Sequence, residues 1–181
     1  MDWVNEVKIK LQRKNQVLFD KNSSCLRDLT VLFEKQKHRV MVLWALDFAA
    51  GSVARLEEKY PDEKRPWEAL EAAWDWASGK IKMRPAQRKI LDCHAFAKEI
   101  SCKEDIAACH AVGQACAVVH TVGHAIGYPI YDLTSLIYRA GTDHCADIVE
   151  LRKQEYADRL FYWRECSDSY QGSWADFLLK S

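Results

Sequence analysis

The segment IAACHAVGQACAVVHTVGHAIG, from Ile106 to Gly127, decides how the rest of the chain must fold. It is 22 residues long and contains no Asp, Glu, Lys or Arg. A helix that is apolar almost all round is buried by the rest of its protein or by a membrane. We therefore expect a buried central helix near residues 103–127. At about 100° per residue, one side of it carries what we call the His/Cys stripe: Cys109, Gly113, Cys116, His120, Gly123 and Gly127, with His124 beside it.

The residue types of this segment argue against a membrane span. Its length nearly suits one, but three His, Gln114 and Thr121 interrupt it, and Ala and Gly stand where Leu and Ile are usual. Insertion into a membrane rewards Leu, Ile, Phe and Val and penalises polar groups. We predict a protein that folds around this helix and has no membrane partner.

Length and helix punctuation predict a single all-α domain over residues 1–181. A chain of this size buries roughly 70% of its unfolded surface, and no Pro-, Gly- or Ser-rich linker divides it. Caps and prolines separate helical patterns, which indicate seven to nine helices packed as antiparallel pairs. After the N-terminal segment, the expected helices span about residues 23–33, 38–60, 66–79, 85–100, 103–127, 132–140 and 142–163, followed by a short amphipathic tail.

The N-terminal segment, residues 1–20, has a less regular helical pattern, from Trp3 to Phe19. Its start, MDWVNEVKIK, lacks the apolar core of a secretion signal. The chain has seven Cys and no C-x-x-C pair, which fits reduced, buried thiols better than disulfides. We therefore expect a cytoplasmic protein. The formal net charge of zero argues against nucleic acid as a partner.

His120 and His124 raise the alternative of a metal site. Four residues apart on a helix, they would share one face, and Cys116 lies one turn earlier. Thiolate and imidazole ligands suit zinc, and His94 and His144 could add ligands from other helices. The competing interpretation is that Gly, Ala and Cys let helices approach closely while each His finds an ordinary hydrogen-bond partner. We favour the second interpretation and expect no cofactor.

Asp47 and Gln114 are the other polar residues inside apolar helices. A buried carboxylate must be paired or protonated, so Asp47 is expected to meet an imidazole or an Arg across the core. Cys116 and His120 would also suit a nucleophilic pair, but Cys116 lies in the middle of an apolar helix. The common phosphate-binding, serine-hydrolase and calcium motifs are absent from the sequence. No catalytic residue is assigned.

Three separated segments together resemble one bacterial family. Residues 38–49, HRVMVLWALDFA, are similar to its H-R-x-x-x-L-W-A-x-D-x-A helix. Two further family segments resemble RPWEALEAAWDWASGKI (65–81) and AACHAVGQACAVVHTVGHAIGYPIY (107–131) in order and spacing. The family is that of immunity proteins similar to the fifth immunity-protein class of polymorphic-toxin systems. The resemblance implies an all-α, cytoplasmic, non-enzymatic protein that binds and neutralises a cognate toxin domain. Among its signature positions are Asp47, Gln114, His120 and His124.

The partner-binding residues are expected on the helix over residues 142–163. Interfaces are rich in Tyr, Trp, Phe and Arg, and these residue types are densest there, outside the central helix. Tyr156, Arg159 and Trp163 would share one helical face, so we predict that they contact the toxin. The alternative is that these aromatics simply close the core. For function as a whole, the alternative to toxin binding is a metal-binding helical protein or an enzyme that uses the His120/His124 face.

Overall fold

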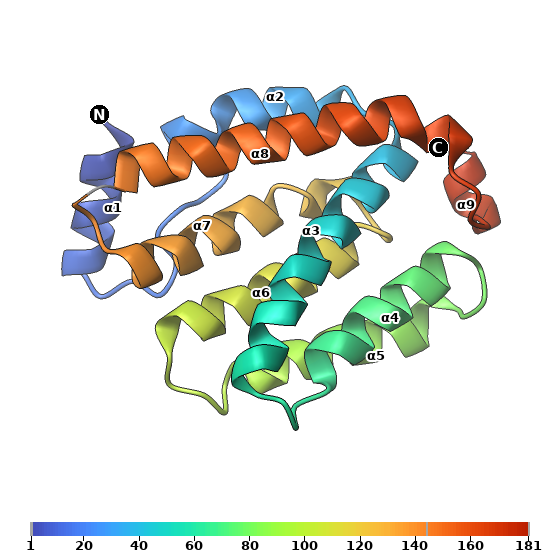
Figure 1. Cartoon of the computed structure of the whole chain (residues 1–181), viewed down its shortest axis with the longest axis horizontal. Coiled ribbons are helices and arrows are strands. Elements are labelled where there is room, and N and C mark those ends of the chain that lie inside the picture. Colours follow the sequence, from blue (N-terminus) through green and yellow to red (C-terminus); the bar gives the residue numbers. More distant parts are fainter. Residues whose placement is uncertain (1, 144, 181) are drawn as a thin grey trace.

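The chain folds into helices joined by short loops, as a computed structural model that describes residues 2–143 and 145–180 shows (Figure 1). No strand occurs in these ranges, and the predicted all-α class with seven to nine helices is confirmed. None of the helices described is both long and apolar enough to cross a membrane. The helices are α1 (Trp3–Gln12), α2 (Arg27–Glu34), α3 (His38–Lys59), α4 (Arg65–Ala77), α5 (Met83–Phe96), α6 (Lys103–Ala117), α7 (Gly127–Ala140), α8 (Cys145–Cys166) and α9 (Asp176–Leu179), with 3-10 turns at Ser24–Leu26, Val122–His124 and Ser167–Ser169.

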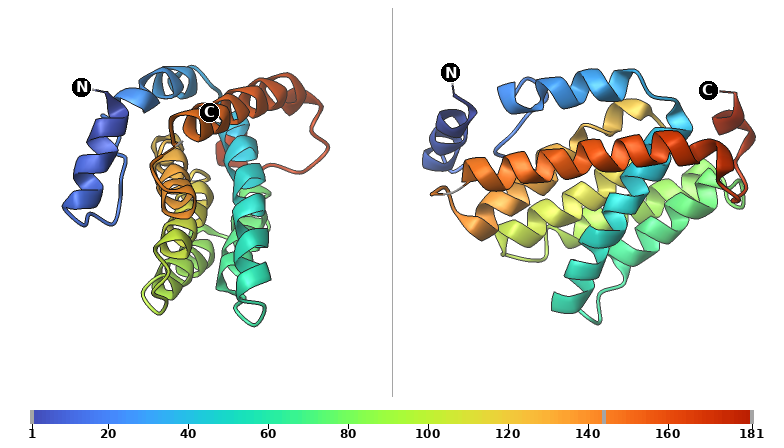
Figure 2. Two further views of the ribbon diagram at one scale, coloured as in Figure 1. Left: turned by 60° about the vertical axis from the view of Figure 1, so that its left-hand side comes forward. Right: turned by 45° about the horizontal axis from the view of Figure 1, so that its top comes forward.

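The helices pair as the short connections require. α4 and α5 form one antiparallel pair, and α6 and α7 form another (Figure 1). α3 packs against α4 and α6, and α8 crosses over α3 and α7 (Figure 2). α1 lies at one end of the molecule and α9 at the other. Only residues 60–64 and 78–82 connect α3, α4 and α5, and such short loops favour neighbouring helices of opposite direction.

The centre of the fold is shared by α6 and α3. Every residue from Val40 to Leu46 on α3 is buried. The indole of Trp44 has no exposed surface, and its Nε1 donates a hydrogen bond to the Tyr156 carbonyl oxygen at 2.9 Å. Its ring also contacts the rings of Phe33 and Phe48. Since a buried aromatic ring dominates the energetics of its surroundings, α3 is as central as the segment from which the sequence analysis began.

The helix expected over residues 103–127 is shorter in the structure, because α6 ends at Ala117. Val118, Val119 and Thr121 follow it, and β-branched residues lose side-chain freedom in a helix. The carbonyl oxygen of Val118 accepts a hydrogen bond from His38 Nε2 at 2.6 Å. A contact from α3 thus satisfies a carbonyl group that the end of α6 leaves unpaired.

Gly127 and Pro129 start a helix and do not end one. The sequence analysis took them as the stop of the central helix, whereas both lie in the first turn of α7. Proline is tolerated in a first turn, where its missing N–H would have no helical partner. The apolar pattern ran on to residue 127 because Val118, Val119 and Ala125 in the connection are themselves buried.

The N-terminal segment is helical only over Trp3–Gln12. Lys14 has a positive φ of 58°, and the helix does not continue to Phe19 as predicted. Leu18 and Phe19 are nevertheless buried, and the Leu18 N–H donates to Thr134 Oγ1 at 3.1 Å. Residues 13–23 therefore pack on α7 without a regular helix.

Candidate functional site

His120, His124 and Cys116 do not form a group of possible metal ligands among the residues that the structure describes. His120 follows the end of α6, is exposed, and stacks on Trp76 with ring centroids 6.0 Å apart. Cys116 is fully buried, and burial raises the pKa of its thiol to about 12. His124 Nδ1 forms a hydrogen bond of 3.0 Å with Gln114 Oε1. The His/Cys stripe depended on an unbroken helix, and the structure instead leaves His120 exposed and Cys116 buried. The described residues of the stripe form no group that could hold a metal ion.

A different histidine pair forms between α5 and α6. His94 Nδ1 lies 2.7 Å from His110 Nδ1, so one ring donates a hydrogen bond and the other accepts it. Gly113 makes room, because a Cβ there would lie 2.3 Å from His94 Nε2. Burial, followed by the charges of His110 and His124, lowers the pKa of His94 to about 4. The sequence analysis considered His94 only as an extra ligand, and His144 lies outside the described residues.

The stability of the protein should fall as this pair becomes protonated. A histidine whose pKa is lowered by folding stabilises the fold fully above about pH 6.5 and loses that contribution towards the folded-state value. For His94 the loss between about pH 7 and about pH 5 should be roughly 1–2 kcal/mol in the free energy of unfolding. Urea unfolding of wild type and of His94→Gln at both pH values measures it.

The control for that experiment is Leu91→Gln, which changes an exposed side chain without a titratable group on the same helix as His94. Its difference in unfolding free energy between the two pH values should match that of the wild type. The difference for His94→Gln should be clearly smaller. If His94→Gln kept the whole wild-type difference, the pair would not be the source of the acid sensitivity.

Asp47 on α3 is the point where two predicted partner-binding residues meet. Its Oδ2 accepts a hydrogen bond from Trp163 Nε1 at 2.8 Å and lies 3.2 Å from Arg159 Nε. The side chain of Asp47 is 30% exposed, so the carboxylate lies at the margin of the core. The predicted pairing of Asp47 with an arginine is therefore present, and none of the histidines that the structure describes pairs with it.

Tyr156 is buried and cannot contact a partner. Its side chain has no exposed surface, and its hydroxyl donates to Asp132 Oδ2 at 2.6 Å. The prediction is wrong for this residue because α8 crosses α3 at Tyr156, where the ring meets Trp44 and Phe48. The spacing of residues on one face of a helix does not show at which of them another helix packs against that face. Tyr162, which is 49% exposed, lies beside Arg159 instead.

Asp132 on α7 is the centre of a polar network that the sequence analysis missed. The residue is 5% exposed. Its Oδ1 lies 3.3 Å from Arg55 Nη2, and its Oδ2 lies 2.7 Å from Arg152 Nε. Together with the Tyr156 hydroxyl, these groups give the buried carboxylate the partners it requires and connect α3, α7 and α8. The signal was a lone Asp in the apolar run PIYDLTSLIY, the same signal that singled out Asp47.

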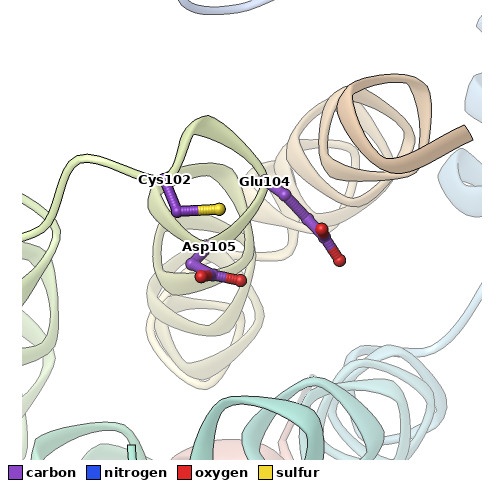
Figure 3. A group of neighbouring side chains, drawn as sticks. All are labelled: Cys102, Glu104 and Asp105. Carbon is purple, nitrogen blue, oxygen red and sulfur yellow. The ribbon is translucent and has the colours of Figure 1, made fainter. Parts of the chain in front are cut away.

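A group of possible ligand side chains lies at the start of α6, where Cys102, which precedes the helix, comes close to Glu104 and Asp105 (Figure 3). Lys59 Nζ lies 2.9 Å from Asp105 Oδ1 and 3.7 Å from Glu104 Oε2. Tyr60 donates to Asp105 Oδ2 at 2.8 Å. Burial alone would raise the pKa of Asp105, but hydrogen bonds from Lys59 and Tyr60 outweigh it and lower the pKa. The Lys59 amine thus supplies the positive charge that faces the carboxylates of Glu104 and Asp105. The cluster joins α3 to α6.

A groove of about 680 Å³ opens next to Asp47. Its aromatic walls are Trp74 from α4, Trp163 from α8 and Tyr170, which follows the last 3-10 turn. The Tyr170 ring folds over Gly172, where a Cβ would lie 2.3 Å from the ring. Aromatic walls around a few polar groups are typical of binding sites. The other residues that line the groove are Leu46, Ala50, Ser78, Lys80 and Ser173.

Comparison with known proteins places this scaffold in a family. The sequence model of the Imm-5 like putative immunity protein family matches residues 31–159, which is most of the chain. The chain therefore belongs to this family, as the resemblance of its three segments indicated. The matched part includes Asp47 and Arg159, whereas Trp163 and Tyr170 follow it. No curated protein and no solved structure matched the chain.

Proposed function

We propose that this protein is an immunity protein that binds a cognate bacterial toxin domain and blocks it by occupying its surface, without catalysing a reaction. Its family supports a role in immunity. The observation that carries the proposal is a partly exposed cluster of side chains on two helices, of the types that are common in protein interfaces. We call it the α3–α8 surface, and it consists of Asp47, Arg159, Tyr162 and Trp163.

The side chains of this surface suit protein recognition. Arg159 and Tyr162 are each 49% exposed, and the Arg159 guanidinium lies 5.6 Å from the centre of the Tyr162 ring. Trp163 is held by its hydrogen bond to Asp47. Trp, Tyr and Arg dominate the energetics of interfaces. Side chains that are already fixed lose less conformational freedom when a partner binds.

We also propose that the protein acts in the cytoplasm. All seven cysteines are free thiols in the part of the chain that the structure describes. Burial raises the pKa of the Cys25 thiol to about 12, which keeps it protonated and unreactive. Unpaired cysteines in this number are typical of reducing compartments.

The test is a double substitution, Arg159→Ala with Trp163→Ala, in the full chain. Arginine and tryptophan hot spots each contribute about 2 kcal/mol or more to binding, so affinity for the toxin domain should fall at least about thirtyfold. The toxin domain to use is sought among the products of the neighbouring reading frames. Two readouts are needed: binding by calorimetry, and growth of a bacterial host that expresses the toxin together with each variant.

Trp67→Ala is the matched control, because Trp67 is also 49% exposed but lies on α4, away from the α3–α8 surface. This variant should bind and protect like the wild type. If the double variant kept its circular dichroism spectrum and still protected the host at the wild-type dose, the α3–α8 surface would not be the binding site. If the wild type itself neither bound nor protected, the proposed function would be wrong.

A further inference from the structure

We propose that a cavity between α3, α7 and α8 binds a phosphate group, held by the guanidinium groups of Arg55 and Arg139 and by the Ser135 hydroxyl. The cavity has a volume of about 230 Å³, and Asp132 and Arg152 also line it. None of its described lining residues belongs to the α3–α8 surface. The inference therefore goes beyond the proposed function and does not depend on it.

The side chains that α7 contributes to the cavity share one face of that helix. Ser135 follows Asp132 by three positions, and Arg139 follows Ser135 by four, which is the spacing of neighbours on a helical face. Arg55 reaches the same cavity from α3, with its Nη2 3.3 Å from Asp132 Oδ1. Hydrogen-bond donors from two helices therefore line one space.

The acceptors of the cavity already have donors. Each carboxylate oxygen of Asp132 accepts two hydrogen bonds. The other carboxylate of the lining, that of Glu155, accepts a hydrogen bond from Arg152 Nη1. Three arginines and two carboxylates line the cavity, so its side chains carry one positive charge in excess.

Several donors of the cavity, by contrast, have no acceptor. Ser135 is 6% exposed, and its hydroxyl forms no hydrogen bond with any residue of 2–143 or 145–180. Buried polar groups nearly always have a partner. The Arg139 guanidinium forms no hydrogen bond within the same ranges. The Glu104 carboxylate lies 4.0 Å from Arg139 Nη1 and is nearer to Lys59 Nζ, at 3.7 Å.

These features fit an oxyanion, and phosphate in particular. Oxyanions form short, strong hydrogen bonds with guanidinium groups, which bind phosphate through two N–H donors at once. A phosphate has enough oxygens to accept from Arg55, Arg139 and Ser135 together, whereas a carboxylate has only two. A cation would meet the excess positive charge. The volume is below the range of roughly 300–1,000 Å³ for pockets that hold drug-sized ligands, so the occupant is the free ion or a small phosphate ester.

The test is a calorimetric titration of the full chain with inorganic phosphate, at an ionic strength held constant with sodium chloride. We expect saturable binding with a Kd of about 1 mM or below, and a thermal unfolding midpoint that rises with phosphate concentration. Acetate should bind about tenfold more weakly, because it offers fewer acceptors to charged donors. Tighter binding of methyl phosphate than of inorganic phosphate would identify the occupant as an ester, and the reverse as the free ion.

Three variants locate the binding. Arg139→Gln should weaken phosphate binding at least about tenfold, the loss expected for a charge-assisted hydrogen bond. Ser135→Ala should weaken it about fivefold. Without phosphate, Ser135→Ala should unfold at the wild-type temperature or above, because its hydroxyl has no partner to lose. Arg88→Gln, which changes an exposed arginine on α5 outside the lining, should bind phosphate like the wild type.

Three results would each overturn the proposal: no saturable binding of either phosphate probe, acetate binding as tight as that of phosphate, or full phosphate binding by Arg139→Gln with an unchanged circular dichroism spectrum. The toxin experiments change other residues, so failure of the phosphate proposal leaves the proposed function as it stands.

Discussion

Replacing Asp132 with alanine should lower the free energy of unfolding by about 3–5 kcal/mol, the loss typical of breaking a buried ion pair. The substitution leaves the Arg152 guanidinium without its buried carboxylate, which now lies 2.7 Å from it. It also leaves the Tyr156 hydroxyl without its acceptor in a fully buried position. Urea unfolding followed by circular dichroism measures the change.

Asp158→Ala provides the comparison, because this exposed carboxylate on α8 has a hydrogen bond from Gln154 and from no other residue within 2–143 and 145–180. It should change the free energy of unfolding by less than about 0.5 kcal/mol. Asp132→Asn keeps the shape and one acceptor oxygen, so its loss should lie between the two. A loss below about 1 kcal/mol for Asp132→Ala would show that the network contributes little to stability.

Gly113→Leu should cost about 3 kcal/mol, at the upper end of the range for overpacked cores. A Cβ at this position would lie 2.3 Å from His94 Nε2 and 2.4 Å from His94 Cε1. The His94 ring cannot move away freely, because its other side is bonded to His110. Either α5 must shift away from α6 or the histidine pair must break. Thermal and urea unfolding give the loss.

Gly51 is the matched control for this substitution. It is also a helical glycine, on α3, but nothing lies within 4 Å of a Cβ built there. Gly51→Leu should therefore stabilise the protein by a few tenths of a kcal/mol or more, since leucine favours helix over glycine. An unchanged midpoint for Gly113→Leu would contradict the close contact between α5 and α6.

Helix positions were predictable where the signal is local. The expected helices over 38–60 and 66–79 correspond to α3 (His38–Lys59) and α4 (Arg65–Ala77). Pro61 follows α3 after Tyr60 alone, and Pro66 lies in the first turn of α4. Proline acts through its own ring and its missing N–H, so its effect can be predicted from neighbouring residues alone.

The end of α6 could not be predicted in this way. It depends partly on a hydrogen bond from His38, 80 positions away along the chain, to the carbonyl of Val118. Apolar periodicity reports burial, and Val118, Val119 and Ala125 in the connection after Ala117 are buried although the connection is not α-helical. The metal alternative relied on the same unbroken helix, and among the described residues His120, His124 and Cys116 do not form a group that could hold a metal ion.

The candidate site was predictable in part, for a physical reason. Asp47 stood out because a carboxylate inside an apolar helix needs a partner, and its partner Arg159 was among the residues chosen for the surface. The sequence did not show that Asp47 and Arg159 would meet, because their contact depends on how α8 crosses α3. The same crossing buries Tyr156 and leaves Trp163 at the margin.

The difference in burial between α3 and the outer face of α8 bears on how such a protein can evolve. Asp47 follows directly after a run of residues, Val40 to Leu46, that is buried throughout, so the position of its carboxylate is set by the core. Arg159 and Tyr162, by contrast, are half exposed. If the proposed function holds, substitutions at these two positions change what the surface recognises while the folded scaffold persists. A lineage that must follow a changing toxin would then diversify α8 and the residues after it, while the position of Asp47 on α3 stays the same.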